Sequence, residues 1–507
     1  MQFKSELFGG WVGKLRLLST LGFLAGSSGI VWASAFAVNE LGTRAQGMGG
    51  AFTAVADDAT AIFFNPAGLA FLRGTSMEMD SLIVNGQFRF IPLDTPAGTV
   101  VPPKGYSGAT QQPFIPIASL YFTKRISERV AVGFGGYTPA GLAANWTNFN
   151  DSDPASGKYV GRFAGSRAAL QQYWFQPTVA IRLSDSQALA VGIAFVHTHL
   201  FLEQSFLNPY EKPDEFGLGL ARGVFPGVDP EAAYRSFARL LPEGRLRAAA
   251  TANKFGVAAG YMYKHRSSGT NIGFNYRSHV VSHLKGTGAF AFTNTGALLP
   301  FLPKNSGLDV QFPNQKIGAT FVTPGLYAVG VSNSRVAGGT LAFDFAIQDF
   351  RRFQDLPINF EKTKDAKGND IGTPAERRLK FNFNNSYVLH AGYEHAAKAL
   401  PGPALMRKMM KDVTLRAGYV FDKSPVPEKS IGPLFPDTNR HSWTVGMTKS
   451  LRAVDLSMFY QFMQFVNTKT NVAANNFQYT NGEYRNFANL IGMGLHWRKG
   501  GHSGKAD

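Results

Sequence analysis

Cysteine is absent from the 507 residues, so no disulfide stabilises this chain. Charged residues make up only 17% of it, and although the formal net charge is +17, the Lys and Arg side chains are scattered rather than clustered. A nucleic-acid partner is therefore not indicated, and anionic lipid headgroups or acidic ligands are the expected counterparts. After residue 35 there is also no run of 18 apolar residues, which argues against helical membrane spans in the mature chain.

The first 35 residues have the organisation of a secretory signal peptide. Basic residues lead into the apolar run "LLSTLGFLAGSSGIVW", and Ala33, Ser34 and Ala35 then form an A-x-A cleavage motif. Glycines and serines at the centre of the run disfavour an uncleaved anchor helix. We expect cleavage after Ala35, a mature chain that begins near Phe36, and export to the bacterial cell envelope.

Beyond position 70 the sequence alternates apolar residues with small or polar ones, which is the period of a β-strand. "FQPTVAIRL", "SDS" and "QALAVGIAFVH" follow one another and together predict a β-hairpin. Val179, Ile181 and Leu183 would then lie on one face of the strand. Ala180 and Arg182 would lie on the other.

Six such hairpins are predicted along the chain. They run from "IASLYF" to "VAVGFGGY", through the pair just quoted, and then from "FGVAAGYMY" to "NIGFNYRS", "GLYAVGVS" to "TLAFDFAIQDF", "SYVLHAGYE" to "VTLRAGYVF" and "HSWTVGMTKS" to "VDLSMFYQFMQF". "SMEMDSLIVNGQFRF" before them and "RNFANLIGMGLHW" after them bring the total to about fourteen strands. We therefore predict an all-β fold, a 14-stranded antiparallel transmembrane β-barrel over residues 75–498.

A soluble β-sandwich or β-propeller of the same length is the alternative. Its exposed strand faces would be charged, whereas these carry Leu, Phe, Ile and Tyr. A bacterial outer-membrane barrel explains such faces, because lipid requires a closed sheet in which every backbone group is paired.

Long connections alternate with short ones and are expected on the extracellular side. In the third, "DPEAAYRSFARLL" predicts a short amphipathic helix with Asp229 as its N-cap, and the fourth contains the apolar "GALLPFLP". The seven connections are expected at residues 91–112, 138–172, 203–253, 280–315, 351–385, 422–440 and 466–484.

Three stretches resemble the FadL/TodX family of outer-membrane transporters for long-chain fatty acids and hydrocarbons. They are "GTRAQGMGGAFTAVADDATAIFFNPAGLA", "FNYRSHVVSHLKG" and "LRAGYVFDKSPVPEKSIGPLFPDTNRH". The resemblance implies a barrel plugged by an N-terminal hatch, here residues 36–74, and uptake of hydrophobic compounds that leave sideways through the wall. We further expect a monomer in contact with the lipid bilayer and lipopolysaccharide, with no cofactor.

Two parts of the chain depart from this pattern. The expected terminal aromatic residue, Trp497, is followed by "RKGGHSGKAD", with residues 499–507 forming a C-terminal tail. "HAAKALPGPALMRKMMKD", residues 395–412, is a long basic connection at a place where a short periplasmic turn is expected.

The hatch contains a rigid polar turn formed by Asn65, Pro66 and Ala67. The residue before a proline is pushed away from helix, so "NPAGL" predicts a turn that starts a short helical piece. We expect the turn to meet polar groups of the lumen. Apolar residues on both sides of it would line or block an apolar path, namely Ile62, Phe63, Phe64 and Leu69.

A fatty acid needs an apolar slot and a cation for its carboxylate. By alternation Arg277 is out of phase with the apolar residues of "NIGFNYR" and faces the lumen. Arg416 does so as well, because Val413, Leu415 and Tyr419 would face lipid. Both arginines are candidate carboxylate ligands, and pairing with acidic groups across the lumen is the structural alternative.

The strand "VAVGFGGYTPAGLAANW" is the candidate for a lateral opening. Glycines weaken a strand and a proline removes a ladder donor, so pairing with a neighbour could fail there. Close packing against the hatch is the alternative reason for the glycines. The candidate residues are Gly133, Gly135, Gly136, Pro139 and Gly141.

Other functions find less support. A general porin would need an open lumen, and the plug-like N-terminal segment argues against one. The mature chain contains no G-x-S-x-G motif, so a lipase or protease is not indicated either. His197 and His199 share a strand face, but no third metal ligand is evident, so no metal is expected. The single NPA motif does not indicate a water channel, and "GMGG" lacks the Lys of a phosphate-binding loop.

Overall fold

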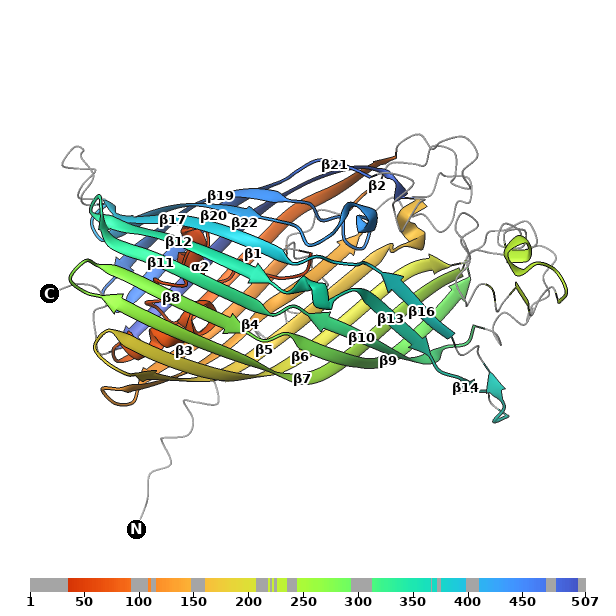
Figure 1. Ribbon diagram of the computed structural model, residues 1–507, viewed down its shortest axis with the longest axis horizontal. Coiled ribbons are helices and arrows are strands. Elements are labelled where there is room, and N and C mark those ends of the chain that lie inside the picture. The colour runs from red at the N-terminus through yellow and green to blue at the C-terminus, as the bar shows by residue number, and fades with distance from the viewer. Residues whose placement is uncertain are drawn as a thin grey trace, which may run out of the picture.

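Figure 1 shows the computed structural model, which describes residues 35–92, 108–110, 115–146, 160–206, 218, 221–222, 226–234, 244–292, 312–365, 367–371, 375–397, 410–470 and 480–499. The fold is a closed antiparallel β-barrel of fourteen wall strands, as predicted. Strands β1 and β22 close it, with pairs from Thr75↔Lys499 to Pro92↔Gly482.

Ten of the wall strands are continuous. They are β1 (Thr75–Pro92), β3 (Ile115–Arg125), β4 (Val130–Asn145), β5 (Arg167–Arg182), β6 (Gln187–Phe206), β7 (Gly244–His265), β18 (Val413–Asp422), β19 (Arg440–Leu451), β20 (Val454–Phe465) and β22 (Gly482–Lys499). Small two-residue strands lie outside this set: β2 (Gly108–Ala109), β14 (Thr363–Lys364), β15 (Asp370–Ile371) and β21 (Thr468–Lys469).

Four neighbouring wall strands are each interrupted at mid-length. Their halves are β8 (Thr270–Arg277) with β9 (Val280–Phe292), β10 (Gln315–Thr323) with β11 (Leu326–Val336), β12 (Gly339–Gln348) with β13 (Asp355–Phe360), and β16 (Ala375–Lys380) with β17 (Ser386–Ala396). The breaks lie side by side in the sheet because the halves pair with the corresponding halves of their neighbours. The last two breaks place Phe350, Phe353, Phe381 and Phe383 in the interior, all of them buried.

Side chains alternate across the wall in the predicted way. Val179 and Ile181 are 48% and 47% exposed on the outer face, whereas Ala180 between them is fully buried. The outer face carries an apolar band that suits lipid, and the inner face packs on the chain inside the barrel. Val413 was expected to face lipid, but it is buried at the first position of β18, where its N–H donates to Met410 O at 3.2 Å.

The short turns lie at one end of the barrel, and β2 and β14, described parts of the expected long connections, lie at the other (Figure 1). The loop boundaries were predicted too wide, because the strands continue well beyond them. Residues 138–145, 167–172, 203–206, 244–253 and 280–292, assigned to loops, belong to β4, β5, β6, β7 and β9. Strands that project beyond the bilayer no longer need apolar outward residues, so their alternation is harder to see.

The predicted helix is present where the structure describes it. Residues 230–234 are helical, and Asp229 Oδ2 accepts a hydrogen bond from Ala232 N at 2.9 Å. Within the described ranges no helix is long and apolar enough to cross a membrane. Four predicted features lie wholly or largely outside the described residues: residues 1–34 of the predicted 1–35 signal peptide, "GALLPFLP", most of the 395–412 connection and the tail after residue 499.

Candidate functional site

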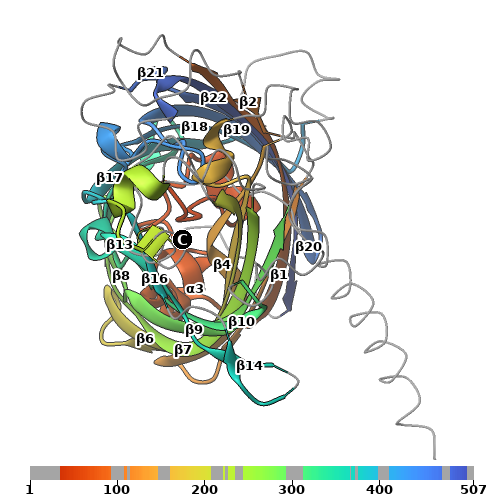
Figure 2. The ribbon, with the colours of Figure 1, turned by 90° about the vertical axis from the view of Figure 1, so that its right-hand side faces the viewer.

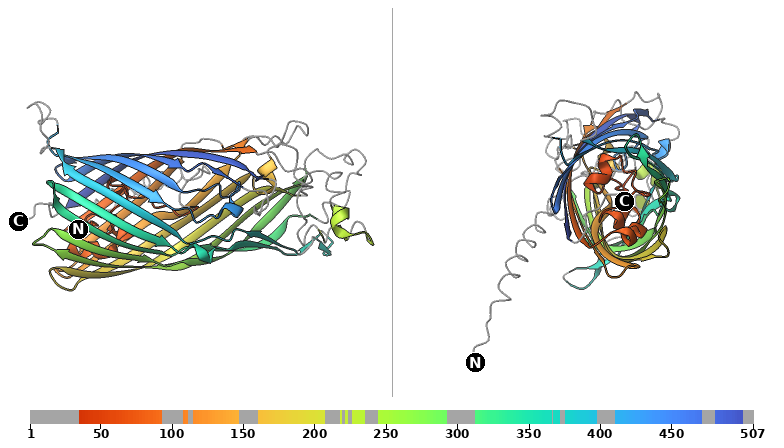
Figure 3. Two further views of the ribbon diagram at one scale, coloured as in Figure 1. Left: turned by 45° about the horizontal axis from the view of Figure 1, so that its top comes forward. Right: turned by 90° about the vertical axis from the view of Figure 1, so that its left-hand side faces the viewer.

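The segment before β1 lies inside the barrel, at the end that carries the short turns (Figures 2 and 3). We call residues 36–74 the plug. It consists of α2 (Thr43–Gly47), α3 (Ala61–Phe64) and the 3₁₀ helix η2 (Pro66–Phe71), joined by turns. Nearly all of its side chains are buried, because α2 packs on β18 to β22 and η2 packs on β4 to β7 across the lumen.

The NPA turn fixes the plug to the wall. Asn65 Nδ2 donates to Thr53 O in the plug at 2.8 Å and to Tyr261 O in β7 at 3.0 Å, while its Oδ1 accepts from Ala67 N at 3.2 Å. Gly260 of β7 leaves the room for this approach, because a Cβ there would collide with the Asn65 side chain. The contact between the turn and the wall is thus made through a backbone carbonyl, Tyr261 O.

Acidic wall residues hold two further points of the plug. Asp344 of β12 accepts the backbone N–H groups of Phe52 at 2.9 Å and Thr53 at 2.7 Å. Glu394 of β17 accepts both Nε and Nη2 of the plug residue Arg44, each at 3.0 Å. Sequence reasoning missed both carboxylates, although an acidic residue in the inward phase of an otherwise apolar strand is a visible signal.

Arg416 faces the lumen, and it belongs to the same network as Glu394. Its Nε donates to Glu394 Oε2 at 2.6 Å and its Nη1 to Thr448 Oγ1 at 2.7 Å. Glu394 therefore lies between one plug arginine and one wall arginine. This arrangement matches the structural alternative for Arg416, a cation paired across the lumen.

Arg277 also faces the lumen, in a different environment. It is only 7% exposed, and its guanidinium lies 4.4 Å from the ring centroid of Phe63 and 5.8 Å from that of Trp174. Within the described residues no carboxylate forms an ion pair with it, and its Nη1 has no hydrogen-bond partner. A pocket beside it is lined by Ala37, Pro139, Gln172, Trp174, Thr323 and Gln348, among others.

The wall has a break between β3 and β4. In the described residues these strands pair only from Leu120↔Gly136 to Arg125↔Ala131, although β4 continues to Asn145. A bulge between Tyr137 and Ala140 shifts the register of β4 against β5 at the same level. We call β4 residues 137–145, which lie beyond the last described pair with β3, the side gap. Beyond it the isolated bridge Thr110↔Trp146 joins the two sides again.

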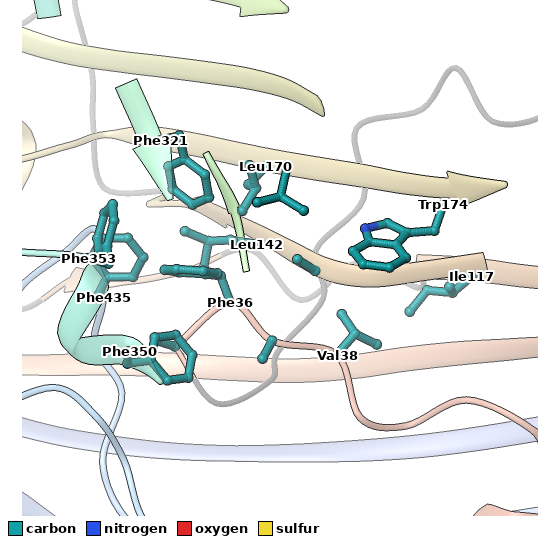
Figure 4. Close-up of a cluster of buried hydrophobic side chains, with 14 of the residues drawn as sticks. Phe36, Val38, Ile117, Leu142, Leu170, Trp174, Phe321, Phe350, Phe353 and Phe435 are labelled. Carbon is teal, nitrogen blue, oxygen red and sulfur yellow. The ribbon is translucent and has the colours of Figure 1, made fainter. Parts of the chain in front are cut away.

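The start of the plug takes the place of β3 along the side gap. Val38 N donates to Pro139 O at 2.9 Å, Gly141 N donates to Phe36 O at 2.8 Å, and Ala37 bridges Ala140 in antiparallel fashion. Phe36 packs among buried phenylalanines from β10, from the break between β12 and β13 and from the loop before β19, as Figure 4 shows. The ring centroids lie 4.9 Å from Phe321, 5.1 Å from Phe350, 5.3 Å from Phe353 and 5.9 Å from Phe435.

The five candidate residues of this strand divide into two groups. Pro139 and Gly141 lie in the side gap, whereas Gly133 and Gly135 lie in the paired part of β4 and Gly136 forms its last pair. A Cβ at Gly133 or Gly135 would approach Ile62 of the plug to 2.9 Å. These two glycines therefore provide close packing against the plug, the alternative considered for them, rather than a failure of pairing.

Comparison with known proteins identifies the family. A sequence model described as outer membrane protein transport protein (OMPP1/FadL/TodX) matches residues 24–498. The chain belongs to this FadL/TodX family. Its curated relatives include an outer membrane protein of Neisseria meningitidis, 24% identical over 95% of this chain and 97% of that protein. A long-chain fatty acid transport protein of Salmonella typhi is 22% identical over 86% of this chain and 89% of its own length.

Solved structures show the same fold. A FadL homologue of Pseudomonas aeruginosa superposes with a TM-score of 0.68 at 16% identity, covering 91% of this chain and 99% of that one. The toluene transporter TbuX of Ralstonia pickettii superposes with a TM-score of 0.61 at 14% identity, covering 90% and 98%. At these identities the likeness concerns the fold alone.

The FadL/TodX family consists of outer-membrane proteins that transport hydrophobic small molecules and are not enzymes, and this protein is one of them. His197 and His199 lie on the outward face of β6, where His197 Nδ1 lies 2.7 Å from Asn253 Oδ1. The described residues contain no group of three side chains suited to hold a metal ion.

Proposed function

We propose that this FadL/TodX protein takes up long-chain fatty acids or similar hydrophobic acids. In this proposal Arg277 binds the carboxylate, and the ligand leaves through the side gap when the start of the plug moves off β4. The observation that carries the proposal is the buried guanidinium of Arg277, which has no acidic partner among the described residues.

An unpaired buried cation is costly, so the environment of Arg277 calls for an anion. Removing one partner of a buried ion pair destabilises a protein by about 3–5 kcal/mol, because the remaining charge is left uncompensated. Aromatic faces offset part of this cost here, since Phe63 and Trp174 both lie under the guanidinium. A carboxylate ligand would supply the missing charge through short, charge-assisted hydrogen bonds.

The chemistry of the pocket separates acids from neutral hydrocarbons. An alkane or toluene would bring no negative charge to Arg277. A fatty acid would place its carboxylate at the guanidinium and its chain against the apolar part of the lining, which includes Ala37, Pro139 and Trp174. The second candidate cation, Arg416, already has Glu394 at 2.6 Å, so it is the weaker ligand for a carboxylate.

The side gap supports a lateral exit. Two residues of the pocket beside Arg277 come from the segments that pair along the side gap: Ala37 from the start of the plug and Pro139 from β4. A ligand beside Arg277 is therefore next to residues 36–38, which pair with β4 along the side gap. An apolar molecule that leaves by this route enters lipid without crossing water.

Mass spectrometry of compounds that co-purify with the protein in mild detergent tests the proposal. The wild type is expected to retain fatty acids, and Arg277→Met, which keeps an apolar side chain of similar length, is expected to lose them. Recovery of only neutral hydrocarbons, or equal fatty-acid recovery from both proteins, would overturn the role of Arg277. A steady, large ion conductance of the wild type in planar bilayers would favour a general porin instead.

A further inference from the structure

A buried cluster of charged groups lies where the plug begins. Arg440, at the start of β19, donates from Nη1 to Asp437 Oδ1 at 3.0 Å and from Nη2 to Asp422 at the end of β18. Glu40 of the plug completes the cluster electrostatically. All four side chains are buried, with exposures between 2% and 8%.

The cluster contains more acidic than basic groups. Three carboxyl groups surround one guanidinium, and among the described residues Arg440 is the basic side chain that forms ion pairs with them. Burial, opposed by Arg440, raises the pKa of Asp437 to about 6 and that of Glu40 to about 7. A second cation would relieve this imbalance.

The second oxygen of Asp437 points at the start of the described chain. Asp437 Oδ2 accepts hydrogen bonds from Ser424 Oγ at 2.7 Å and from the backbone nitrogen of Ala35 at 2.9 Å. The next residue, Phe36, is fully buried among the phenylalanines shown in Figure 4. Signal-peptide cleavage is expected between these two residues, which would make Phe36 the first residue of the mature protein.

We propose that Asp437 and Ser424 form the binding site for the terminal ammonium of mature Phe36. Cleavage after Ala35 creates a positive charge one residue, about 3.8 Å of chain, from the nitrogen that Asp437 contacts. That ammonium would add a second cation beside Arg440 to the described groups of the cluster, in contact with Asp437. An uncleaved chain offers only a neutral amide at this point.

The consequence concerns the side gap. Residues 36–38 pair with β4 across the gap, and the ammonium fixes the end of this short segment to the loop between β18 and β19. Removal of the signal peptide is thus the step that completes the plug. The inference depends on the predicted cleavage site and not on which compound is transported, so the two proposals stand or fall separately.

Acetylation of the terminal amine tests the ion pair. The protein is purified from outer membranes, its first residue is identified by mass spectrometry, and it is exposed briefly to an N-hydroxysuccinimide ester when folded and when heat-unfolded. The expected result is Phe36 as first residue, with labelling at least about tenfold slower in the folded protein, the factor that about 1.4 kcal/mol of protection gives. A different first residue, or equal labelling rates, would overturn the proposal.

Two variants separate the ion pair from simple burial of the chain end. Asp437→Asn should accelerate labelling of the folded protein about tenfold, whereas Glu428→Gln, which changes an exposed acid on the same loop, should not. In a second variant, a glycine is inserted between Ala35 and Phe36. It leaves Asp437 in place but moves the terminal ammonium one residue away from it, so this variant should also be labelled faster. If both altered proteins label as slowly as the wild type, the site is wrong. Heat-modified migration in gels verifies that each barrel is folded.

Discussion

Glu394 in the barrel wall accepts two hydrogen bonds from the plug residue Arg44, with both nitrogens 3.0 Å from its oxygens. The same carboxylate pairs with Arg416, so one acid holds two cations, one from the plug and one from the wall. The plug is therefore attached to the barrel by charge as well as by packing.

Replacing this acid should loosen the plug. In Glu394→Ala the two arginines lose their shared partner and repel each other, and each charged hydrogen bond lost costs about 1.5–3 kcal/mol. We expect raised ion conductance in planar bilayers. Glu376→Gln, an exposed acid paired with Arg378 near the opposite end of the barrel, serves as control. Equal conductance of both variants and the wild type would show that the plug does not depend on Glu394.

The NPA turn gives a second prediction. Asn65→Ala removes the side-chain donor to Thr53 O, at a cost of about 1–3 kcal/mol for the buried carbonyl, and it removes the link to Tyr261 O in the wall. Asn65→Asp should be worse, because a carboxylate would face both carbonyls. Fatty-acid uptake should change in both variants while heat-modified migration shows an intact barrel, and Pro66→Ala should have a smaller effect. Unchanged uptake in all three variants would reduce the motif to local packing.

Neighbouring glycines of β4 provide a matched pair. In Gly135→Ala the new methyl group would lie 2.9 Å from Ile62 and 3.1 Å from Tyr121, whereas in Gly136→Ala it would meet only Phe175 at 3.8 Å. We expect Gly135→Ala to lose about 1–3 kcal/mol of stability or to displace the plug. Gly136→Ala should be near neutral. Equal thermal stability and uptake in the two variants would contradict the packing role of Gly135.

The absence of cysteine allows a clean disulfide test of the side gap. Ala37 and Ala140 are partners in an antiparallel bridge, a geometry that brings Cα atoms within disulfide range. In Ala37→Cys/Ala140→Cys the oxidised protein should lose uptake and regain it on reduction, since the start of the plug can no longer leave β4. Full uptake by the oxidised protein would exclude movement of this segment as the gate.

The fold could be predicted from sequence because alternation in strands such as β5 and β6 is visible residue by residue. The full length of the strands was missed where the outer face turns polar. In β9, for example, the outward face carries His283, Lys285 and Thr287 instead of apolar residues at these positions. Inward phase was likewise predictable for Arg277 and Arg416. The partners of the two arginines could not be predicted, because they depend on how the plug folds inside the barrel. No pattern in the neighbouring sequence indicates them.

Comparative ligand affinity tests the central claim most directly. Binding of a long-chain fatty acid and of the alcohol of equal chain length is measured by calorimetry for the wild type and Arg277→Met. One charge-assisted hydrogen bond of about 1.5–3 kcal/mol predicts that the wild type prefers the acid by about 10- to 100-fold and that Arg277→Met loses this preference while it still binds the alcohol. Equal affinity of the wild type for acid and alcohol, or an unchanged preference in the variant, would contradict a carboxylate site at Arg277.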